Sequence, residues 1–295
     1  MVTSESRAGG CGSGSGDGDG VAAVTLRGRR IGSGEPLFVI AGPCVLEAPD
    51  AMLRLAGELA AVCARFGLGY CFKSSYLKDN RTSGASPRGP GPEEGLRLLA
   101  RIGDAHGVPL LTDVHHPDEA AAAAEVVDIL QIPAFLCRQT SLLEAAGRTG
   151  RLVNVKKGQF LAPADLGHAA AKVRGAGCPG VLATERGSFF GYRDLVVDFR
   201  AVPLLHRLGL PVVMDATHAV QSPGSTGIVT GGAPEMIPLY VRCGMAAGAD
   251  ALFLEVHPDP PRALSDAASQ LPLPAFAGLV EQARRFRDLY RECVS

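Results

Sequence analysis

The sequence predicts an α/β fold of the (β/α)8 TIM-barrel class. Eight short runs rich in Val, Ile, Leu and Phe alternate with eight segments of helical spacing. Parallel strands need a helical crossover between neighbours, and eight such units close into a barrel of about 250 residues. An open doubly wound sheet is the structural alternative, but no Gly-x-Gly-x-x-Gly turn follows the first predicted strand.

The predicted strands are bounded by Gly or Pro and mostly lack polar alternation, which is typical of strands buried on both faces. They are 37–41, 70–74, 109–114, 128–132, 151–156, 181–184, 211–215 and 251–255. The predicted helices between them are 51–66, 92–106, 118–126, 141–148, 164–173, 194–208, 234–247 and 274–293. Before the first strand, residues 24–26 and 30–31 predict a small hairpin that caps the bottom of the barrel.

The chain is long enough for one sizeable domain. It has 295 residues, 46% of them hydrophobic. Residues 1–20 are dominated by Gly, Ser and Asp and have no apolar segment of the kind found in signal peptides. We therefore expect residues 1–20 to be a disordered tail and residues 21–295 to form a single catalytic barrel domain.

Charge and cysteine content exclude several classes of partner. The formal net charge is −1, which gives no electrostatic footprint for nucleic acid or an anionic membrane surface. The sequence has no apolar run long enough to cross a membrane. Its eight cysteines are scattered singly, without a Cys-x-x-Cys pair, which favours a reducing, cytoplasmic location.

The residues after strands 1, 7 and 8 predict a metal site. In a barrel enzyme the loops after the strands converge at one mouth, and strands 1, 7 and 8 are neighbours in a closed ring. Cys44, His218, Glu255 and Asp266 follow these strands. A thiolate, an imidazole and two carboxylates suit a divalent ion such as zinc, iron(II) or manganese.

Each of these residues also has a simpler explanation. Cys44 can be a buried apolar cysteine, His218 a hydrogen-bonded core histidine, and Asp266 the N-cap of a following helix. Their joint placement at the ends of adjacent strands favours the metal site.

A second group at the same mouth is cationic and predicts anionic ligands. Lysine at the end of a buried strand pays a desolvation cost that a phosphate or carboxylate can offset, and arginine grips phosphate with two hydrogen bonds. The group comprises Lys73, Lys78, Arg81, Arg138, Lys156 and Arg186. A solvated surface patch is the simpler interpretation for Arg88 and Lys157. Two further polar candidates, Asp113 and Gln131, end or lie within strands 3 and 4.

Several motifs in one order resemble the enzyme family 3-deoxy-D-manno-octulosonate 8-phosphate synthase, also called 2-dehydro-3-deoxyphosphooctonate aldolase. They are IAGPC (40–44), FKSS (72–75), KDNRTS (78–83), RGPG (88–91), QIPAFLCRQT (131–140), NVKK (154–157), TERG (184–187) and DATH (215–218). The resemblance extends from about Leu37 to Leu273.

The resemblance implies a condensation of phosphoenolpyruvate with D-arabinose 5-phosphate and water, with release of inorganic phosphate. It also implies a homotetramer and a role in lipopolysaccharide biosynthesis. Two small phosphorylated substrates agree with the cationic group found from the residues alone. A synthase that uses another phosphorylated aldose, such as erythrose 4-phosphate, and a non-catalytic sugar-phosphate-binding barrel are the alternatives.

The resemblance also implies roles for individual residues. Phosphoenolpyruvate would be held by Lys73, Lys156 and Arg186, with Ser75 and Gln131 nearby. Lys78 would lie between the two substrates, with Asp113 in the substrate site. Asn80 and Arg81 would bind the arabinose 5-phosphate, whose phosphate would also meet Arg138 of a neighbouring subunit, with Phe135 at that boundary.

The family resembled has metal-dependent and metal-independent members. Metal-dependent members have Cys at the position of Cys44 and metal-independent members have Asn, so the resemblance implies the metal-dependent class. The metal can orient the sugar, polarise its aldehyde or activate water, and the sequence does not choose among these roles. Asp79 departs from the family pattern, which has a small residue there, and adds a negative charge near the sugar-binding segment.

Overall fold

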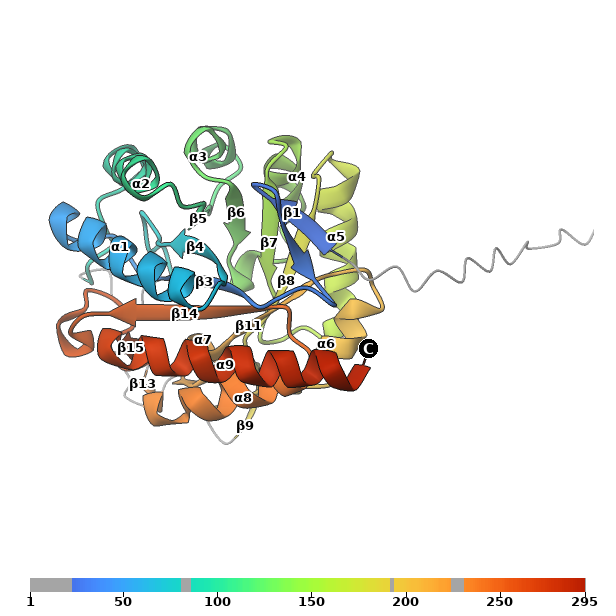
Figure 1. The fold of residues 1–295 in the computed structure, drawn as a ribbon. Helices are drawn as coiled ribbons and strands as arrows, with labels where there is room; N and C mark the ends of the chain where they lie inside the picture. Colours follow the sequence, from blue (N-terminus) through green and yellow to red (C-terminus); the bar gives the residue numbers. More distant parts are fainter. Residues whose placement is uncertain (1–22, 81–85, 192–193, 224–230, 295) are drawn as a thin grey trace, which may run out of the picture.

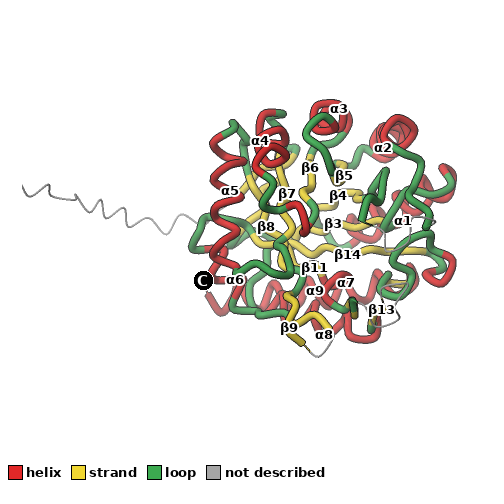
Figure 2. Tube along the Cα trace, turned by 180° about the vertical axis from the view of Figure 1, so that it is seen from behind, coloured by secondary structure: helices red, strands yellow, loops and turns green. Residues whose placement is uncertain are grey.

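The computed structural model describes residues 23–80, 86–191, 194–223 and 231–294. A closed ring of eight parallel strands forms its centre (Figures 1 and 2). In ring order the strands are β11 (Val212–Asp215), β8 (Val181–Glu185), β7 (Leu152–Lys156), β6 (Ile129–Ile132), β5 (Leu110–Asp113), β4 (Gly69–Lys73), β3 (Phe38–Gly42) and β14 (Ala251–His257). The pairing of β11 with β14 closes the ring, so the predicted barrel is confirmed.

Helices surround the ring on its outer side, as the tube view in Figure 2 shows. They are α1 (Pro49–Arg65), α2 (Pro92–His106), α3 (Glu119–Val126), α4 (Thr140–Arg148), α5 (Leu166–Gly175), α6 (Ala201–His206), α7 (Ala216–Ala219), α8 (Ile237–Ala246) and α9 (Leu273–Val294). Four short 3-10 helices, η1 (Ala134–Leu136), η2 (Pro163–Asp165), η3 (Pro234–Met236) and η4 (Pro260–Arg262), lie in the connections.

The ends of α2 illustrate how local sequence sets these elements. Pro92 occupies the first turn, where its missing N–H costs nothing. Gly107 ends the helix with a left-handed φ of 64° and donates its N–H to the Gly103 carbonyl. Between these residues Leu98, Leu99 and Ile102 form the buried face that packs on the barrel.

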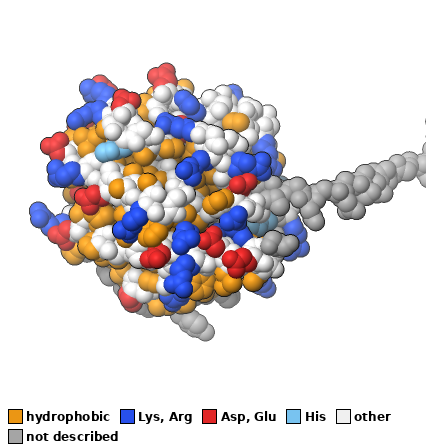
Figure 3. Space-filling view, in the orientation of Figure 1, with side chains coloured by type: hydrophobic (Ala, Val, Ile, Leu, Met, Phe, Trp, Pro, Cys, Tyr) orange, Lys and Arg blue, Asp and Glu red, His pale blue; other side chains and the backbone are white. Residues whose placement is uncertain are grey.

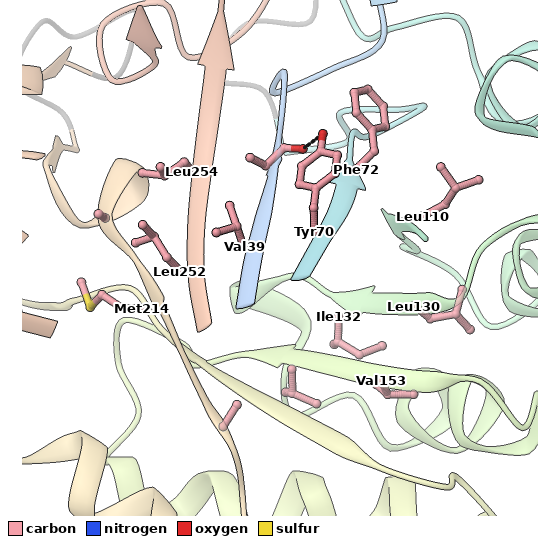
Figure 4. Close-up of a cluster of buried hydrophobic side chains, with 14 of the residues drawn as sticks. Val39, Tyr70, Phe72, Leu110, Leu130, Ile132, Val153, Met214, Leu252 and Leu254 are labelled. Carbon is pink, nitrogen blue, oxygen red and sulfur yellow. Dashed lines mark hydrogen bonds between the residues drawn. The ribbon is translucent and has the colours of Figure 1, made fainter. Parts of the chain in front are cut away.

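Two apolar layers hold the barrel together. The outer layer lies between the strands and the helices, and Figure 4 shows part of it, with Val39, Phe72 and Leu130 pointing away from the barrel axis. The hydroxyl of Tyr70 lies in this layer and donates to the Ala41 carbonyl at 3.0 Å. The inner layer fills the barrel with Phe38, Ile40, Cys71, Leu111, Ile129, Leu152, Leu182, Val213, Ala251 and Phe253.

The inner faces of the strands change from apolar to polar toward the mouth. Side chains alternate between the two faces of a strand, so the next inward residue lies two positions further on. The apolar inner residues are followed at that spacing by Lys73, Asp113, Gln131, Asn154, Thr184, Asp215 and Glu255. All of these polar residues are buried. The barrel interior is therefore apolar at its centre and lined by polar and charged side chains at the mouth.

The predicted hairpin closes the bottom of the barrel. Strands β1 (Ala23–Leu26) and β2 (Arg29–Gly32) pair antiparallel. Val24, Leu26 and Ile31 belong to the same buried cluster as the inner barrel residues. The fully buried Arg287 of α9 donates to the Gly32 carbonyl at 3.0 Å and so ties the C-terminal helix to the hairpin.

One predicted helix is wrong over its first half. Residues 194–208 were expected to be helical, but Asp194–Val196 form strand β10, which pairs antiparallel with β9 (Ser188–Gly191). Leu195 and Val197 are buried while Asp194 and Val196 are exposed, which is the period of a strand. Helix α6 starts only at Ala201.

Three short strands complete the description. They are β12 (Gln221–Ser222), β13 (Gly231–Gly232) and β15 (Leu271–Pro272). The predicted tail, residues 1–20, lies outside the described residues. Among the described helices none is long and apolar enough to span a membrane. Positive and negative side chains are interspersed on the face shown in Figure 3.

Candidate active site and metal centre

Cys44, Glu255 and Asp266 form a compact group at the mouth that could hold a metal ion, and it is called the metal-binding group below. Each offers a ligand atom, and these atoms all lie within 4.8 Å of one another. The thiol of Cys44 lies 3.0 Å from the hydroxyl of Ser265 and 3.3 Å from Oδ2 of Asp266. Cys44 and Glu255 are fully buried. The predicted convergence of these three residues is therefore observed.

His218 borders this group without joining its tightest cluster. Its Nε2 lies 3.5 Å from Oε1 of Glu255 and 3.7 Å from Oδ2 of Asp266. Asp215 caps α7 by accepting the backbone N–H of His218, and its other oxygen lies 2.8 Å from Nδ1 of the ring. The carboxylate thus fixes the ring so that Nε2 faces the metal-binding group, an arrangement common for ligating histidines.

The residues present fit a divalent cation. A thiol, two carboxylates and an imidazole form a mixed donor set for zinc, iron(II) or manganese. Oε2 of Glu255 is buried and has no hydrogen-bond partner among the described residues. Burial, with Asp266 and Glu255 close by, raises the pKa of the Cys44 thiol well above its ordinary value. A bound cation would favour the thiolate instead.

The predicted N-cap role for Asp266 does not apply, because no helix starts there. Asp266 has a left-handed φ of 50°, a conformation that non-glycine residues seldom adopt. Such strained positions cluster at functional sites. The conformation directs the Asp266 carboxylate to the thiol of Cys44.

Four buried cations surround the metal-binding group. Lys73 donates to Oε1 of Glu255 at 2.9 Å and to the Cys44 carbonyl at 3.2 Å. Lys78 is 4.0 Å from the same carboxylate oxygen. Lys156 pairs with Asp215 at 2.7 Å. All three lysines are buried, and for Lys73 and Lys156 this agrees with the prediction from their positions at strand ends.

Arg186 is the fourth cation and is also buried. Its Nη2 donates to the His218 carbonyl at 2.9 Å and to Oε1 of Gln221 at 2.7 Å. Its Nε is buried and has no partner among the described residues. A guanidinium that retains free donors can still bind an anionic ligand.

In this layer the neighbouring charges keep two acids ionised, whereas burial disfavours the charged form of Lys156. Burial alone would raise the pKa of Asp215, but His218 and Lys156 outweigh it and hold that pKa well below its ordinary value. Burial likewise opposes ionisation of Glu255, and the surrounding cations lower its pKa. Burial lowers the pKa of Lys156 despite Asp215. The acids are therefore firmly ionised, and an added anion would stabilise the charged form of Lys156.

The polar substrate-site candidates occupy the same buried layer. Gln131, Ser75 and Asp113 are all buried. The hydroxyl of Ser75 and Oδ1 of Asp113 have no partner among the described residues. Buried polar atoms without partners are uncommon and are typical of a site that a ligand completes.

The described candidates for binding the sugar phosphate are exposed. Asn80 is exposed, and Arg81 lies outside the described residues. Phe135, in η1, is 50% exposed, and Arg138 is exposed beside it. Of the described candidates, Asn80, Phe135 and Arg138 lie at the surface and not in the buried cationic layer.

Sequence reasoning missed the aromatic floor of the site. The ring of Phe253 in β14 lies 4.2 Å from Nζ of Lys156 and 5.4 Å from Nζ of Lys73, measured to the ring centroid. Phe253 precedes Glu255 by two positions, so the alternation of the last strand was the available signal. Asp215 was also missed, although its place at a strand end was visible.

The solvated interpretation of Lys157 is wrong. Its ammonium is fully buried, 3.6 Å from Oε2 of Glu185, and donates to the hydroxyl of Ser188 at 3.0 Å. Lys157 points to the opposite face of β7 from Lys156. Arg88 is half-exposed and forms an ion pair with Asp79, in keeping with its surface assignment.

Most of the chain matches a known protein family. The family model described as "DAHP synthetase I family" matches residues 20–288. The chain belongs to this family. Three similar proteins illustrate the resemblance. All three are named 2-dehydro-3-deoxyphosphooctonate aldolase.

The first, from Synechococcus sp., is 52% identical over 262 residues, covering 89% of this chain and 92% of the relative. The second, from Koribacter versatilis, is 52% identical and covers 86% and 92% of the two chains. The third, from Cyanothece sp., is 50% identical and covers 87% and 94%. The sequence-based recognition of a carbon–carbon bond-forming synthase is therefore confirmed for this DAHP synthetase I family member.

Proposed function

We propose that the protein condenses phosphoenolpyruvate with D-arabinose 5-phosphate and water to give 3-deoxy-D-manno-octulosonate 8-phosphate and inorganic phosphate. The observation that carries this proposal is the ring of four buried cations, Lys73, Lys78, Lys156 and Arg186, beside the metal-binding group. Burial lowers the pKa of both Lys156 and Arg186, and Nε of Arg186 has no partner among the described residues, so an anionic ligand would stabilise the charged forms of both. The names of the relatives agree with this reaction.

Phosphoenolpyruvate fits the deeper part of the mouth. Lys73, Lys156 and Arg186 would hold its carboxylate and phosphate, with Ser75 and Gln131 donating to its oxygens. Support comes from the buried donors of this layer, including Nε of Arg186. Asp113 and Lys78, both buried, would lie toward the aldose.

The chemistry requires two anions to approach each other. Carbon 3 of phosphoenolpyruvate attacks the sugar aldehyde, and the positive charge that develops at carbon 2 is quenched by water before phosphate leaves. The clamped cations reduce repulsion between the two anions and align the reacting carbons. Lys78, which the family resemblance places between the two substrates, would stabilise the oxyanion that forms from the aldehyde.

One divalent ion, zinc, iron(II) or manganese, would be held by Cys44, His218, Glu255 and Asp266. When bound it would supply Lewis-acid chemistry at the mouth. The donor set and the unpartnered Oε2 of Glu255 support this assignment. Asp215 would keep the His218 ring in place.

Assembly completes the sugar-phosphate end of the site in this proposal. Asn80 and Arg81 would bind the arabinose 5-phosphate together with Arg138 of a neighbouring subunit in a homotetramer, with Phe135 at the boundary. The exposure of Phe135 and Arg138 supports this. Residues 21–295 would form the single catalytic domain, behind a disordered tail, in the cytoplasm, as part of lipopolysaccharide biosynthesis. The seven described cysteines are all free, in keeping with a reducing location.

The decisive experiment is an aldose panel assayed for phosphate release from phosphoenolpyruvate. Arabinose 5-phosphate, its epimers and erythrose 4-phosphate would be compared, each with and without a chelator. We expect turnover to be highest with arabinose 5-phosphate and to be lost on chelation. Preference for another aldose would overturn the substrate assignment, and phosphoenolpyruvate binding without turnover in the metal-loaded enzyme would overturn the reaction.

A further inference from the structure

A chain of three buried side chains runs beneath the cations, across strands β6, β7 and β8. Thr184 donates from Oγ1 to Oδ1 of Asn154 at 2.6 Å. Asn154 in turn donates from Nδ2 to Oε1 of Gln131 at 3.0 Å. Asn154 and Thr184 are fully buried, and Gln131 is 3% exposed.

This chain has a direction, and the direction decides what Gln131 can recognise. Because the carbonyl oxygen of its amide accepts from Asn154, its NH2 group is left for other partners. No described residue accepts a hydrogen bond from that NH2 group. If the chain ran the other way, Gln131 would present its carbonyl oxygen, which an anionic ligand would repel.

The next strand favours the observed direction. Gln131 is the register partner of Asn154 on one side and of Asp113 on the other. His115 and Lys78 outweigh burial and hold the pKa of Asp113 well below its ordinary value, so this neighbour is a carboxylate. An amide between a carboxylate and Asn154 is most stable with its nitrogen on the carboxylate side.

We propose that Thr184 and Asn154 are positioning residues that fix Gln131 as a hydrogen-bond donor to an oxygen of the phosphorylated enol-acid substrate. This inference rests on the proposed function and adds a specificity device to it. Thr184 lies two residues before Arg186, and Asn154 two residues before Lys156. Strands β7 and β8 thus position two cations, Lys156 at the end of β7 and Arg186 directly after β8. The same strands carry the two residues that orient the amide of Gln131.

The test is a double-mutant cycle between Thr184 and Gln131 in the metal-loaded enzyme. Thr184→Val keeps the shape and removes the hydroxyl, so the amides lose their orientation. We expect the KM for phosphoenolpyruvate to rise about three- to tenfold, while kcat and the KM for the aldose change less than about twofold. Thr184→Ser keeps the hydroxyl and should restore the wild-type KM.

The decisive comparison uses a Gln131→Ala background. If Thr184 acts through Gln131, Thr184→Val should change the KM for phosphoenolpyruvate less than about twofold there. An equal penalty in both backgrounds, or an unchanged KM in the wild-type background, would overturn the proposal. Because all values are ratios to active parent enzymes, this outcome is distinct from a failure of the proposed reaction, in which the parent itself would not turn over.

Two further variants guard against a trivial loss of stability. Thr112→Val also removes a fully buried hydroxyl, which donates to the Ser74 carbonyl at 2.8 Å. Thr112 lies on the face of β5 opposite to that of Asp113. The Thr112→Val variant should lower the melting temperature similarly without raising the KM for phosphoenolpyruvate. Asn154→Asp offers an acceptor alone, so the Gln131 amide must turn to it. We expect a larger rise in that KM than for Thr184→Val, and a smaller one would also contradict the proposal.

Discussion

Lys73 and Glu255 form an ion pair of 2.9 Å in which neither side chain is more than 1% exposed. A buried pair of this kind is sustained only when further polar groups satisfy it. Here the Cys44 carbonyl accepts from the same ammonium, while Oε2 of Glu255 remains free for a cation. One carboxylate therefore links the buried cations to the metal-binding group.

Replacing Glu255 by Gln should destabilise the protein. His218, Lys73, Lys78 and Lys156, whose positive charges lower the pKa of Glu255, would lose its negative charge, which leaves buried cations less well compensated. We expect the free energy of unfolding to fall by about 3–5 kcal/mol, measured by urea denaturation. Glu281→Gln, at an exposed position of α9, is the control and should change it by less than about 0.5 kcal/mol.

Cys44→Ala should abolish most turnover because it removes the thiolate from the metal-binding group. Metal content measured on the purified variant should fall with activity. Cys63→Ala is the matched control, since Cys63 is equally buried but lies in α1. It should keep its metal and its activity. Cys44→Asn is expected to retain part of its turnover without metal, and full activity of metal-free wild-type enzyme would contradict the metal assignment.

Arg186→Lys keeps the positive charge but loses the planar fork of donors. We expect the KM for phosphoenolpyruvate to rise at least about tenfold, because a lysine cannot bond the His218 carbonyl, Gln221 and a ligand in one plane. Arg174→Lys, on the surface of α5, should leave the kinetics unchanged. A similar KM in both variants would show that charge alone suffices at Arg186.

Stability should depend on pH through His115. Burial alone would lower the pKa of this ring, but the carboxylates of Asp113 and Glu119, at 3.4 and 3.6 Å, outweigh it and raise the pKa to about 9 from 6.5. A raised pKa stabilises the fold fully below pH 6.5, and that contribution is lost as the pH rises through about 9. Unfolding measured from pH 6 to 10 should show this loss, and His115→Gln should flatten the curve.

Glu119 determines the acid side of the same pH dependence of stability. Burial opposes its ionisation, but His115 and the Tyr76 hydroxyl, 2.8 Å away, lower its pKa to about 2 from 4.5. Its contribution is present above pH 4.5 and is lost as the pH falls toward 2. Maximal stability from this pair therefore lies between about pH 4.5 and 6.5. A maximum above pH 8 would contradict the assignment of both groups.

Arg287→Leu tests the buried charge at the other end of the barrel. Arg287 pairs with Asp250 at 2.9 Å, and Asp250 also accepts from Nε2 of His206 and the backbone N–H of Val212, each at 2.7 Å. Losing the guanidinium should cost about 3–5 kcal/mol of stability without changing KM. Arg284→Leu, on the partly exposed side of α9, should cost less than about 1 kcal/mol.

The sequence was sufficient for the barrel and for most of the charged layer, because both depend on local signals. Apolar runs locate the strands, and the residue at each strand end locates a side chain at the mouth, as for Lys73 and Glu255. Contacts between strands are different. The link from Thr184 through Asn154 to Gln131 depends on register, which no single run of sequence encodes.

The two wrong predictions, a helix over residues 194–196 and a surface position for Lys157, have the same kind of physical cause. Residues 194–196 contain apolar residues that also fit a helix, and the decision for a strand comes from pairing with β9. Lys157 was assigned to the surface because lysine usually lies there. Its ammonium pairs with Glu185 of the neighbouring strand and donates to the carbonyls of Gly187, in the loop after that strand, and of Leu161, in the loop after Lys157 itself.

The latch between Arg287 and Gly32 joins groups 255 residues apart in the sequence. The hairpin that carries Gly32 also shares its buried cluster with Phe253 from the last barrel strand. The first described segment to leave the ribosome can therefore reach its final place only after the last has been made. Trimming either terminus into these elements would release the other, so the two ends of the described chain are a single cooperative unit.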